Sequence, residues 1–175
     1  MQDEVLILGG GVAGCAASIA LARKGRRVTL IEREPTPRHK VCGEFLSGEA
    51  LEDLHLLGVD VTSLGAVPIN YVRLAAARRA ATAPLPFPAK SLTRKALDTA
   101  LIATAIAAGV RVERGRSVQS LRHATANRWQ ATLDDGTTYE APTAFLATGK
   151  HDLRGHDRPK DEWKAISGFR SSLKN

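Results

Sequence analysis

A glycine-rich segment at residues 9–14, reading Gly-Gly-Gly-Val-Ala-Gly, carries the residue types that point most directly to chemistry. It follows the apolar run 5–8 and leads into an alanine-rich stretch, so it predicts a strand that turns directly into a helix. Glycines at this spacing permit a tight turn, a close approach of backbone N–H groups to an anion, and close helix packing. We expect the helix start to hold the pyrophosphate of a dinucleotide, with the binding residues Gly9, Gly11, Val12, Ala13 and Gly14.

A carboxylate at the end of the next predicted strand supports this interpretation. Residues 28–31 are apolar enough for a buried strand, and Glu32 follows them, eighteen residues after Gly14. At that position a carboxylate can accept hydrogen bonds from both hydroxyls of an adenosine ribose, and it would repel a 2′-phosphate. Arg33 is the neighbouring cation that would instead favour the phosphorylated ribose. The alternative is a structural strand–helix unit, because glycine triplets also form ordinary tight turns.

The remaining periodicity predicts the elements that must position these residues. Helices are expected over 12–24, ended by Gly25, from the N-cap Ser47 to Gly58, and over 93–108. Strands are expected over 71–75, 110–112, 117–122, 129–133, 137–139 and 143–147. The turn Asp134-Asp135-Gly136 indicates a hairpin. The fold class is therefore α/β, a Rossmann-like parallel sheet with helices, in which a three-stranded antiparallel meander forms one crossover.

Composition narrows the function classes. The 175 residues are 43% hydrophobic but only 5% aromatic, which suits one domain with an aliphatic core. The net charge of +7 comes from scattered basic residues without an aromatic stripe, so no nucleic-acid partner is expected. No apolar run could cross a bilayer, and the chain begins directly with a strand, so we expect no membrane insertion, no signal peptide and a cytoplasmic protein. The two cysteines and five histidines show no disulfide or metal-ligand spacing.

Four segments together resemble the FAD-dependent oxidoreductases of the glutathione-reductase-like fold, in their geranylgeranyl-reductase-like and aromatic-hydroxylase-like branch. The first is the glycine segment with Glu32. The second, residues 37–47, is similar to the K-x-C-G-[GE]-x-[LI]-S segment of the geranylgeranyl-reductase-like enzymes. The third, residues 92–101, is similar to their R-x-x-[LF]-D-x-x-L helix start, and the fourth is Ala-Thr-Gly at 147–149.

This resemblance implies FAD as cofactor, with NAD(P)H as a candidate electron donor. It implies that Arg94 faces the cofactor as a phosphate partner and that the backbone of Val118 passes near the adenine. Thr148 and Gly149 would skirt the pyrophosphate, and a loop would lie near the flavin and the substrate entrance, with the residues Lys40, Cys42 and Gly43. Alternatively, Arg94 is a surface helix residue, Lys40 is a solvated loop cation, and Cys42 is an inert thiol.

Two departures from the family shape the expected function. At residues 147–154 the chain lacks the Asp-Gly of the aromatic hydroxylases, which leaves reductase or dehydrogenase chemistry open. Family members are about twice as long, so we expect a truncated chain: an FAD-binding domain over 1–150, then a polar tail or the start of a missing substrate domain over 151–175. We expect an oxidoreductase acting on a small organic substrate. The alternatives are a non-catalytic nucleotide-binding module and an NAD-dependent dehydrogenase. No catalytic side chain, substrate or oligomeric state is assigned.

Overall fold

A four-stranded parallel sheet forms the centre of the computed structural model, which describes residues 4–40, 42, 44–77, 79–149, 153, 155 and 156. Its strand order is β12-β1-β2-β8. The four strands are β1 (Glu4–Leu8), β2 (Arg27–Glu32), β8 (Arg111–Arg114) and β12 (Thr143–Leu146). The expected α/β class with a parallel sheet is confirmed.

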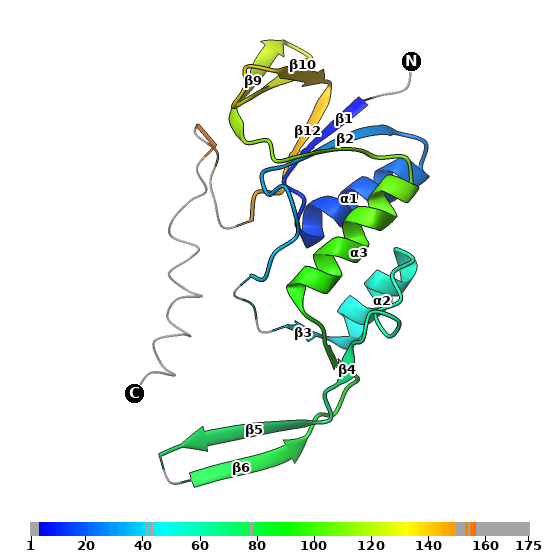
Figure 1. Ribbon diagram of the computed structural model, residues 1–175, viewed down its shortest axis with the longest axis vertical. Coiled ribbons are helices and arrows are strands. Elements are labelled where there is room, and N and C mark those ends of the chain that lie inside the picture. Colours follow the sequence, from blue (N-terminus) through cyan, green and yellow to red (C-terminus); the bar gives the residue numbers. More distant parts are fainter. Residues whose placement is uncertain are drawn as a thin grey trace.

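Each face of this sheet is covered by a different layer (Figure 1). Helices α1 (Val12–Arg23) and α3 (Arg94–Ala107) pack on one face against Val5, Ile7 and Leu30. A meander of β9 (Val118–Thr125), β10 (Arg128–Leu133) and β11 (Thr138–Ala141) covers the other face, against Leu6 and Leu8. Because successive strand residues point to opposite faces, a strand buried on both faces needs a continuous apolar run.

The meander is the crossover that the sequence predicted. It leaves the sheet after β8 and returns through β12, which pairs in parallel with β1. The hairpin turn at residues 134–136 is confirmed, with the Gly136 N–H donating to the Leu133 carbonyl at 3.1 Å. The predicted helices are also confirmed to within one or two residues at their ends, and the hydroxyls of Ser47 and Thr93 cap α2 (Gly48–Leu56) and α3.

The strand predicted over 71–75 is confirmed as β5 (Tyr71–Ala76), but four other strands among the described residues were not predicted. β6 (Arg79–Pro84) pairs with β5 (Tyr71–Ala76) in an antiparallel ribbon, although its alanine-rich sequence has no strand alternation. Three two-residue strands form a small sheet in the order β3-β7-β4, namely β3 (Phe45–Leu46), β7 (Lys90–Ser91) and β4 (Val67–Pro68). Strands this short leave no periodicity in a sequence.

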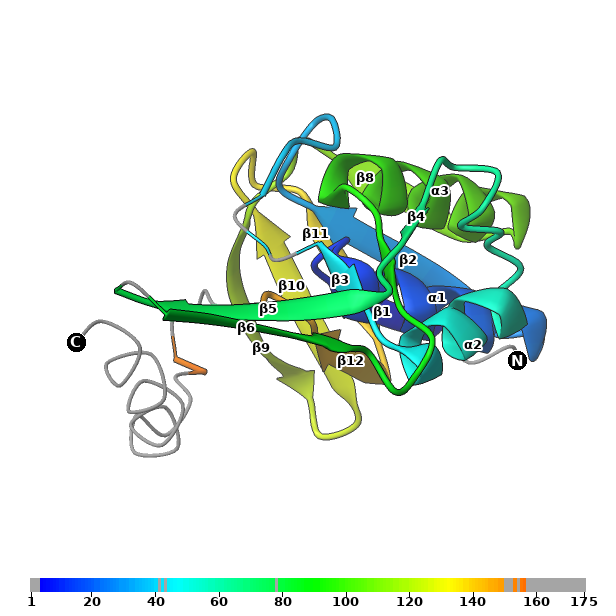
Figure 2. The ribbon, with the colours of Figure 1, turned by 90° about the horizontal axis from the view of Figure 1, so that it is seen from below.

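The β5–β6 ribbon extends away from the rest of the molecule (Figures 1 and 2). Every described residue of both strands is exposed, with Leu74 at 70% and Tyr71 at 66%. A two-stranded ribbon without a packed face is marginally stable, so this ribbon contributes little to the stability of the domain.

Three residues of the expected tail, 151–175, belong to the described part of the chain. Leu153 is buried with the meander core, and His156 Nε2 lies 3.0 Å from the Leu121 carbonyl oxygen. The other tail residues lie outside the described residues, and the predicted boundary at 150 stays a prediction. None of the described helices has the length and hydropathy needed to cross a membrane.

Two glycines let α1 start directly at the end of β1. Gly9 has φ +116°, and a Cβ there would lie 2.3 Å from the Ala147 carbonyl oxygen. A Cβ on Gly14 would lie 1.8 Å from the Gly9 carbonyl oxygen. Since no side chain fits either contact, the expected roles of Gly9 in the turn and of Gly14 in close helix packing are confirmed.

We expect the substitution Gly14→Ala to lower the free energy of unfolding by about 3 kcal/mol, because the helix must shift away from the strand to accept the methyl group. Urea denaturation followed by circular dichroism measures this. The matched control is Gly11→Ala, whose Cβ meets no atom within 4 Å and whose φ of −76° suits alanine. Equal stability of the two variants would contradict the conclusion that Gly14 must be glycine for α1 to pack against Gly9.

Among the lysines and arginines of the described residues, we expect trypsin to cut first in the β5–β6 ribbon, at Arg73 or Arg79. The exposed ribbon can unfold locally at little cost in free energy, so its backbone can enter the protease. Arg23 is less accessible, because it lies in α1 and its side chain donates hydrogen bonds to the carbonyls of Leu56 and Leu57. Mass spectrometry of the earliest fragments identifies the sites. Initial cleavage at Arg23 would contradict the prediction.

Candidate functional site

The first turn of α1 faces the carboxyl end of the sheet with free donors. The first N–H groups of a helix, here those of Val12, Ala13 and Gly14, have no partner within the helix, and they carry the positive end of its dipole. No acidic residue lies in this turn, and no side chain caps it. The space beside Gly11 is open to at least 4 Å. This arrangement can accept an anion such as a phosphate.

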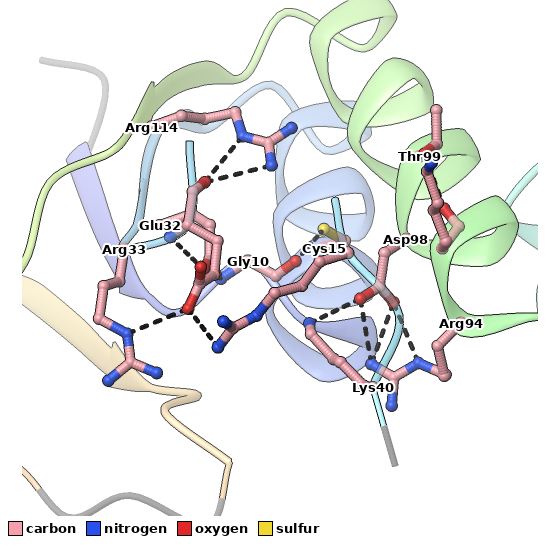
Figure 3. Close-up of polar contacts among 12 residues, drawn as sticks. Gly10, Cys15, Glu32, Arg33, Lys40, Arg94, Asp98, Thr99 and Arg114 are labelled. Atoms are coloured by element: carbon pink, nitrogen blue, oxygen red, sulfur yellow. Dashed lines mark hydrogen bonds and ion pairs between the residues drawn. The ribbon is translucent and has the colours of Figure 1, made fainter. Parts of the chain in front are cut away.

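Glu32 lies against the glycine segment (Figure 3). Its Oε2 accepts a hydrogen bond from the Gly10 N–H at 2.5 Å, and its Oε1 accepts one from the Glu34 N–H at 2.8 Å. A Cβ on Gly10 would lie 2.9 Å from the Glu32 Cβ, so Gly10 must be glycine for the carboxylate to reach this position. Gly10 was not among the predicted site residues, although it stands inside the predicted motif.

Glu32 and Gly10 form part of the wall of a hollow that continues along the loop after β2. The residues lining it are Gly10, Glu32, Glu34, Thr36, Pro37, Arg38, Lys40, Asp98, Ile102 and Arg114. Arg114, on β8, donates from Nε and Nη2 to the Glu34 carbonyl oxygen, both at 3.2 Å. This contact holds the loop against the sheet and places the hollow beside α1. Arg114 was missed because its partner is 80 residues away in the chain.

Cys15 lies under this hollow in the first turn of α1. It is fully buried, and its Sγ donates to the Gly10 carbonyl oxygen at 3.3 Å. Burial, with the nearby carboxylates of Asp98 and Glu32, raises the pKa of the thiol to about 12. Cys15 therefore stays a neutral thiol at ordinary pH and packs as an apolar residue.

Lys40 and Arg94 meet at Asp98, the aspartate of the R-x-x-[LF]-D-x-x-L segment, for which the sequence predicts no role. Lys40 Nζ lies 2.6 Å from Asp98 Oδ2, and Arg94 Nη2 lies 3.0 Å from Asp98 Oδ1. Asp98 is 3% exposed, while its two partners are partly exposed. Burial lowers the pKa of Arg94, but Asp98 outweighs it and the pKa is raised. Arg94 therefore keeps its charge, and Lys40 is paired rather than a freely solvated loop cation.

The other predicted residues fall into two groups. Thr148 and Gly149 follow β12 close to Gly9, since the Thr148 nitrogen would lie 3.1 Å from a Cβ on Gly9. Val118 opens β9 two residues after Arg116, whose N–H donates to the Glu32 carbonyl at 3.2 Å. These three residues therefore lie around the same end of the sheet as the glycine segment.

Arg33 and the cysteine loop are placed differently. The Arg33 side chain points to Glu34, with Nε 3.5 Å from Oε1, and Arg38 pairs with the same oxygen at 2.7 Å. Arg33 is outside the set of described residues that line the hollow. Cys42 is exposed, and Gly43 lies outside the described residues.

The described residues fit the adenosine diphosphate part of a dinucleotide. The open space at Gly11 beside free N–H donors suits a pyrophosphate, and the Glu32 carboxylate suits a ribose diol. The hollow lined by Glu32, Lys40 and Asp98 also includes Gly10, the residue before Gly11. The residues present at the site therefore fit a dinucleotide cofactor.

Comparison with known proteins agrees with this geometry. A family described as FAD binding domain matches residues 2–146. Menaquinone reductase of Mycolicibacterium smegmatis is 30% identical over 160 residues, which cover 88% of this chain and 39% of the relative. Squalene epoxidase of Schizosaccharomyces pombe is 37% identical over 59 residues, covering 33% of this chain and 13% of the relative. The chain thus spans about two fifths of the length of the menaquinone reductase that it matches.

Solved structures of flavoenzymes share the fold. A mutant of 2-methyl-3-hydroxypyridine-5-carboxylic acid oxygenase superposes with a TM-score of 0.75 at 25% identity, covering 89% of this chain and 43% of that one. The flavin-dependent halogenase CmlS superposes with a TM-score of 0.71 at 26% identity, covering 82% and 28%. Because the family match spans most of the chain and the site fits its cofactor, the protein belongs to the FAD binding domain family, with FAD as its cofactor.

Proposed function

We propose that this chain forms the nucleotide-binding part of an FAD-dependent reductase or dehydrogenase, in the geranylgeranyl-reductase-like branch of the glutathione-reductase-like fold. The observation that carries the proposal is the Glu32 carboxylate held against Gly10, beside the open N-terminus of α1. The branch assignment is supported by the contact between its two signature segments. Lys40 of the loop segment and Arg94 of the helix segment share the Asp98 carboxylate.

Each part of the cofactor has proposed partners in the chain. The N–H groups of residues 11–14 would bind the pyrophosphate, and Glu32 would bind the adenosine ribose. Lys40 and Arg94 would add charge-assisted contacts to the phosphates. Val118 would line the adenine position, and Thr148 and Gly149 would border the pyrophosphate.

The flavin of FAD supplies hydride transfer, with NAD(P)H as the candidate electron donor. The residues of this chain bind and orient the cofactor, and no side chain is proposed as a general acid or base. Two relatives are named for menaquinone and for squalene, which are both apolar isoprenoid molecules. We extend this to an apolar isoprenoid as the substrate class.

We expect the purified protein to bind FAD and to release it on denaturation. Glu32→Gln should weaken FAD binding about tenfold or more, because it removes a charged acceptor of ribose hydrogen bonds. Gly11→Ala should weaken binding at least as much, since its methyl group occupies the open space at the helix start. Flavin fluorescence titration measures both dissociation constants.

The matched control is Glu52→Gln on the exposed side of α2, which should bind FAD like the wild-type chain. A wild-type chain that takes up no FAD, or that binds NAD in its place, would overturn the proposed function. Equal FAD affinity of the Glu32→Gln and wild-type proteins would overturn the role of Glu32.

A further inference from the structure

Asp98 is the one charged residue of the described part of the chain whose side chain is almost wholly buried. A buried carboxylate loses its hydration, which costs several kcal/mol unless charged partners offset the loss. Its two partners come from separate segments: Lys40 from the loop after β2, and Arg94 from the first turn of α3. An apolar side chain at position 98 would fill the same space without the cost of burying a charge. This cost raises the question of a role for the charged cluster beyond packing.

The geometry of the cluster fixes both cations at once. Arg94 donates from Nε and Nη2 to Asp98 Oδ1, at 3.1 and 3.0 Å, which holds the plane of its guanidinium. Lys40 donates to the other oxygen, Oδ2, at 2.6 Å. Arg94 Nη2 also reaches Oδ2, at 3.3 Å, so Oδ1 holds Arg94 and Oδ2 is shared by both cations. The three groups together carry one net positive charge. Figure 3 shows the two long side chains converging on this one carboxylate.

The cluster lies where the phosphates of a dinucleotide are expected. Lys40 and Asp98 line the same hollow as Gly10 and Glu32. Asp98 is also the carboxylate with the larger influence on the Cys15 thiol, which sits in the first turn of α1. Lys40 and Asp98 of the positive cluster therefore border the same hollow as the proposed ribose partner, Glu32, and Gly10 of the glycine segment.

We propose that Asp98 is a positioning residue, which holds Lys40 and Arg94 as a preorganised cation pair directed at the diphosphate of the cofactor. This inference rests on the proposed function. Lysine and arginine side chains lose much rotamer freedom when they bind a ligand, and a cation already fixed in the free protein has less left to lose. Asp98 does not touch the cofactor in this account and acts through its two partners.

The sign of one substitution separates this role from simple electrostatics. Asp98→Asn removes a negative charge beside an anion site, so Coulomb attraction alone predicts tighter binding of ADP and FAD. Positioning predicts the opposite. We expect Asp98→Asn to bind ADP and FAD about tenfold more weakly than the wild-type chain, as measured by calorimetric titration at low and moderate salt. Unchanged or tighter binding would overturn the proposal.

A double-mutant cycle tests whether Asp98 acts through Lys40. In a Lys40→Gln background, Asp98→Asn should reduce ADP affinity by a clearly smaller factor than in the wild-type background, because one of the oriented cations is gone. A purely structural role of Asp98 would reduce affinity equally in both backgrounds. Asp53→Asn, on the exposed side of α2, is the matched control and should leave ADP affinity unchanged.

Two further outcomes keep the test decisive. If Asp98→Asn does not fold, Lys40→Gln alone should still weaken ADP binding several-fold and make it less dependent on salt, and unchanged values would overturn the proposal. A wild-type chain that binds neither ADP nor FAD would refute the proposed function itself. A wild-type chain that binds both, with Asp98 variants of equal affinity, would refute the role of Asp98 alone.

Discussion

The structure depends on one steric constraint, the passage of β1, α1 and the end of β12 through a space with no room for a Cβ atom. At Gly9 that atom would meet the Ala147 carbonyl, and at Gly14 it would meet the Gly9 carbonyl. Since the three segments touch backbone to backbone, α1 begins immediately where β1 ends. Its unpaired N–H groups consequently open onto the carboxyl edge of the sheet, where ligands bind in folds of this class.

The glycine segment also determines where the charged groups lie around the site. Gly10 leaves room for Glu32, so a carboxylate sits beside the helix start. Asp98 sits on the other side of Cys15 and is covered by two cations. The site therefore has a hydrogen-bond acceptor at Glu32 and net positive charge at the cluster of Lys40, Arg94 and Asp98. This division of charge matches the adenosine diphosphate half of FAD.

The parts of the fold that depend on local patterns were predictable from the sequence. The glycine segment, Glu32, the two long helices and the meander each follow from spacing or periodicity within a short window. Asp98 shows the limit of this approach. Its pairing with Arg94 is a recognisable i, i+4 signal, but Lys40 stands 58 residues away and its contact depends on how the loop after β2 folds back. The β6 strand escaped prediction because its alanines carry no alternation, and its partner strand, β5, supplies its hydrogen bonds.

We propose that the N-terminus of α1 and Glu32 together receive the adenosine diphosphate part of the cofactor. Backbone amide shifts in a ¹⁵N NMR spectrum, recorded during addition of ADP, test it most directly. We expect the largest shifts at Gly10, Gly11, Val12 and Ala13, with no change in the β5–β6 ribbon. Shifts confined to residues away from the glycine segment, or a spectrum that ADP leaves unchanged, would contradict it.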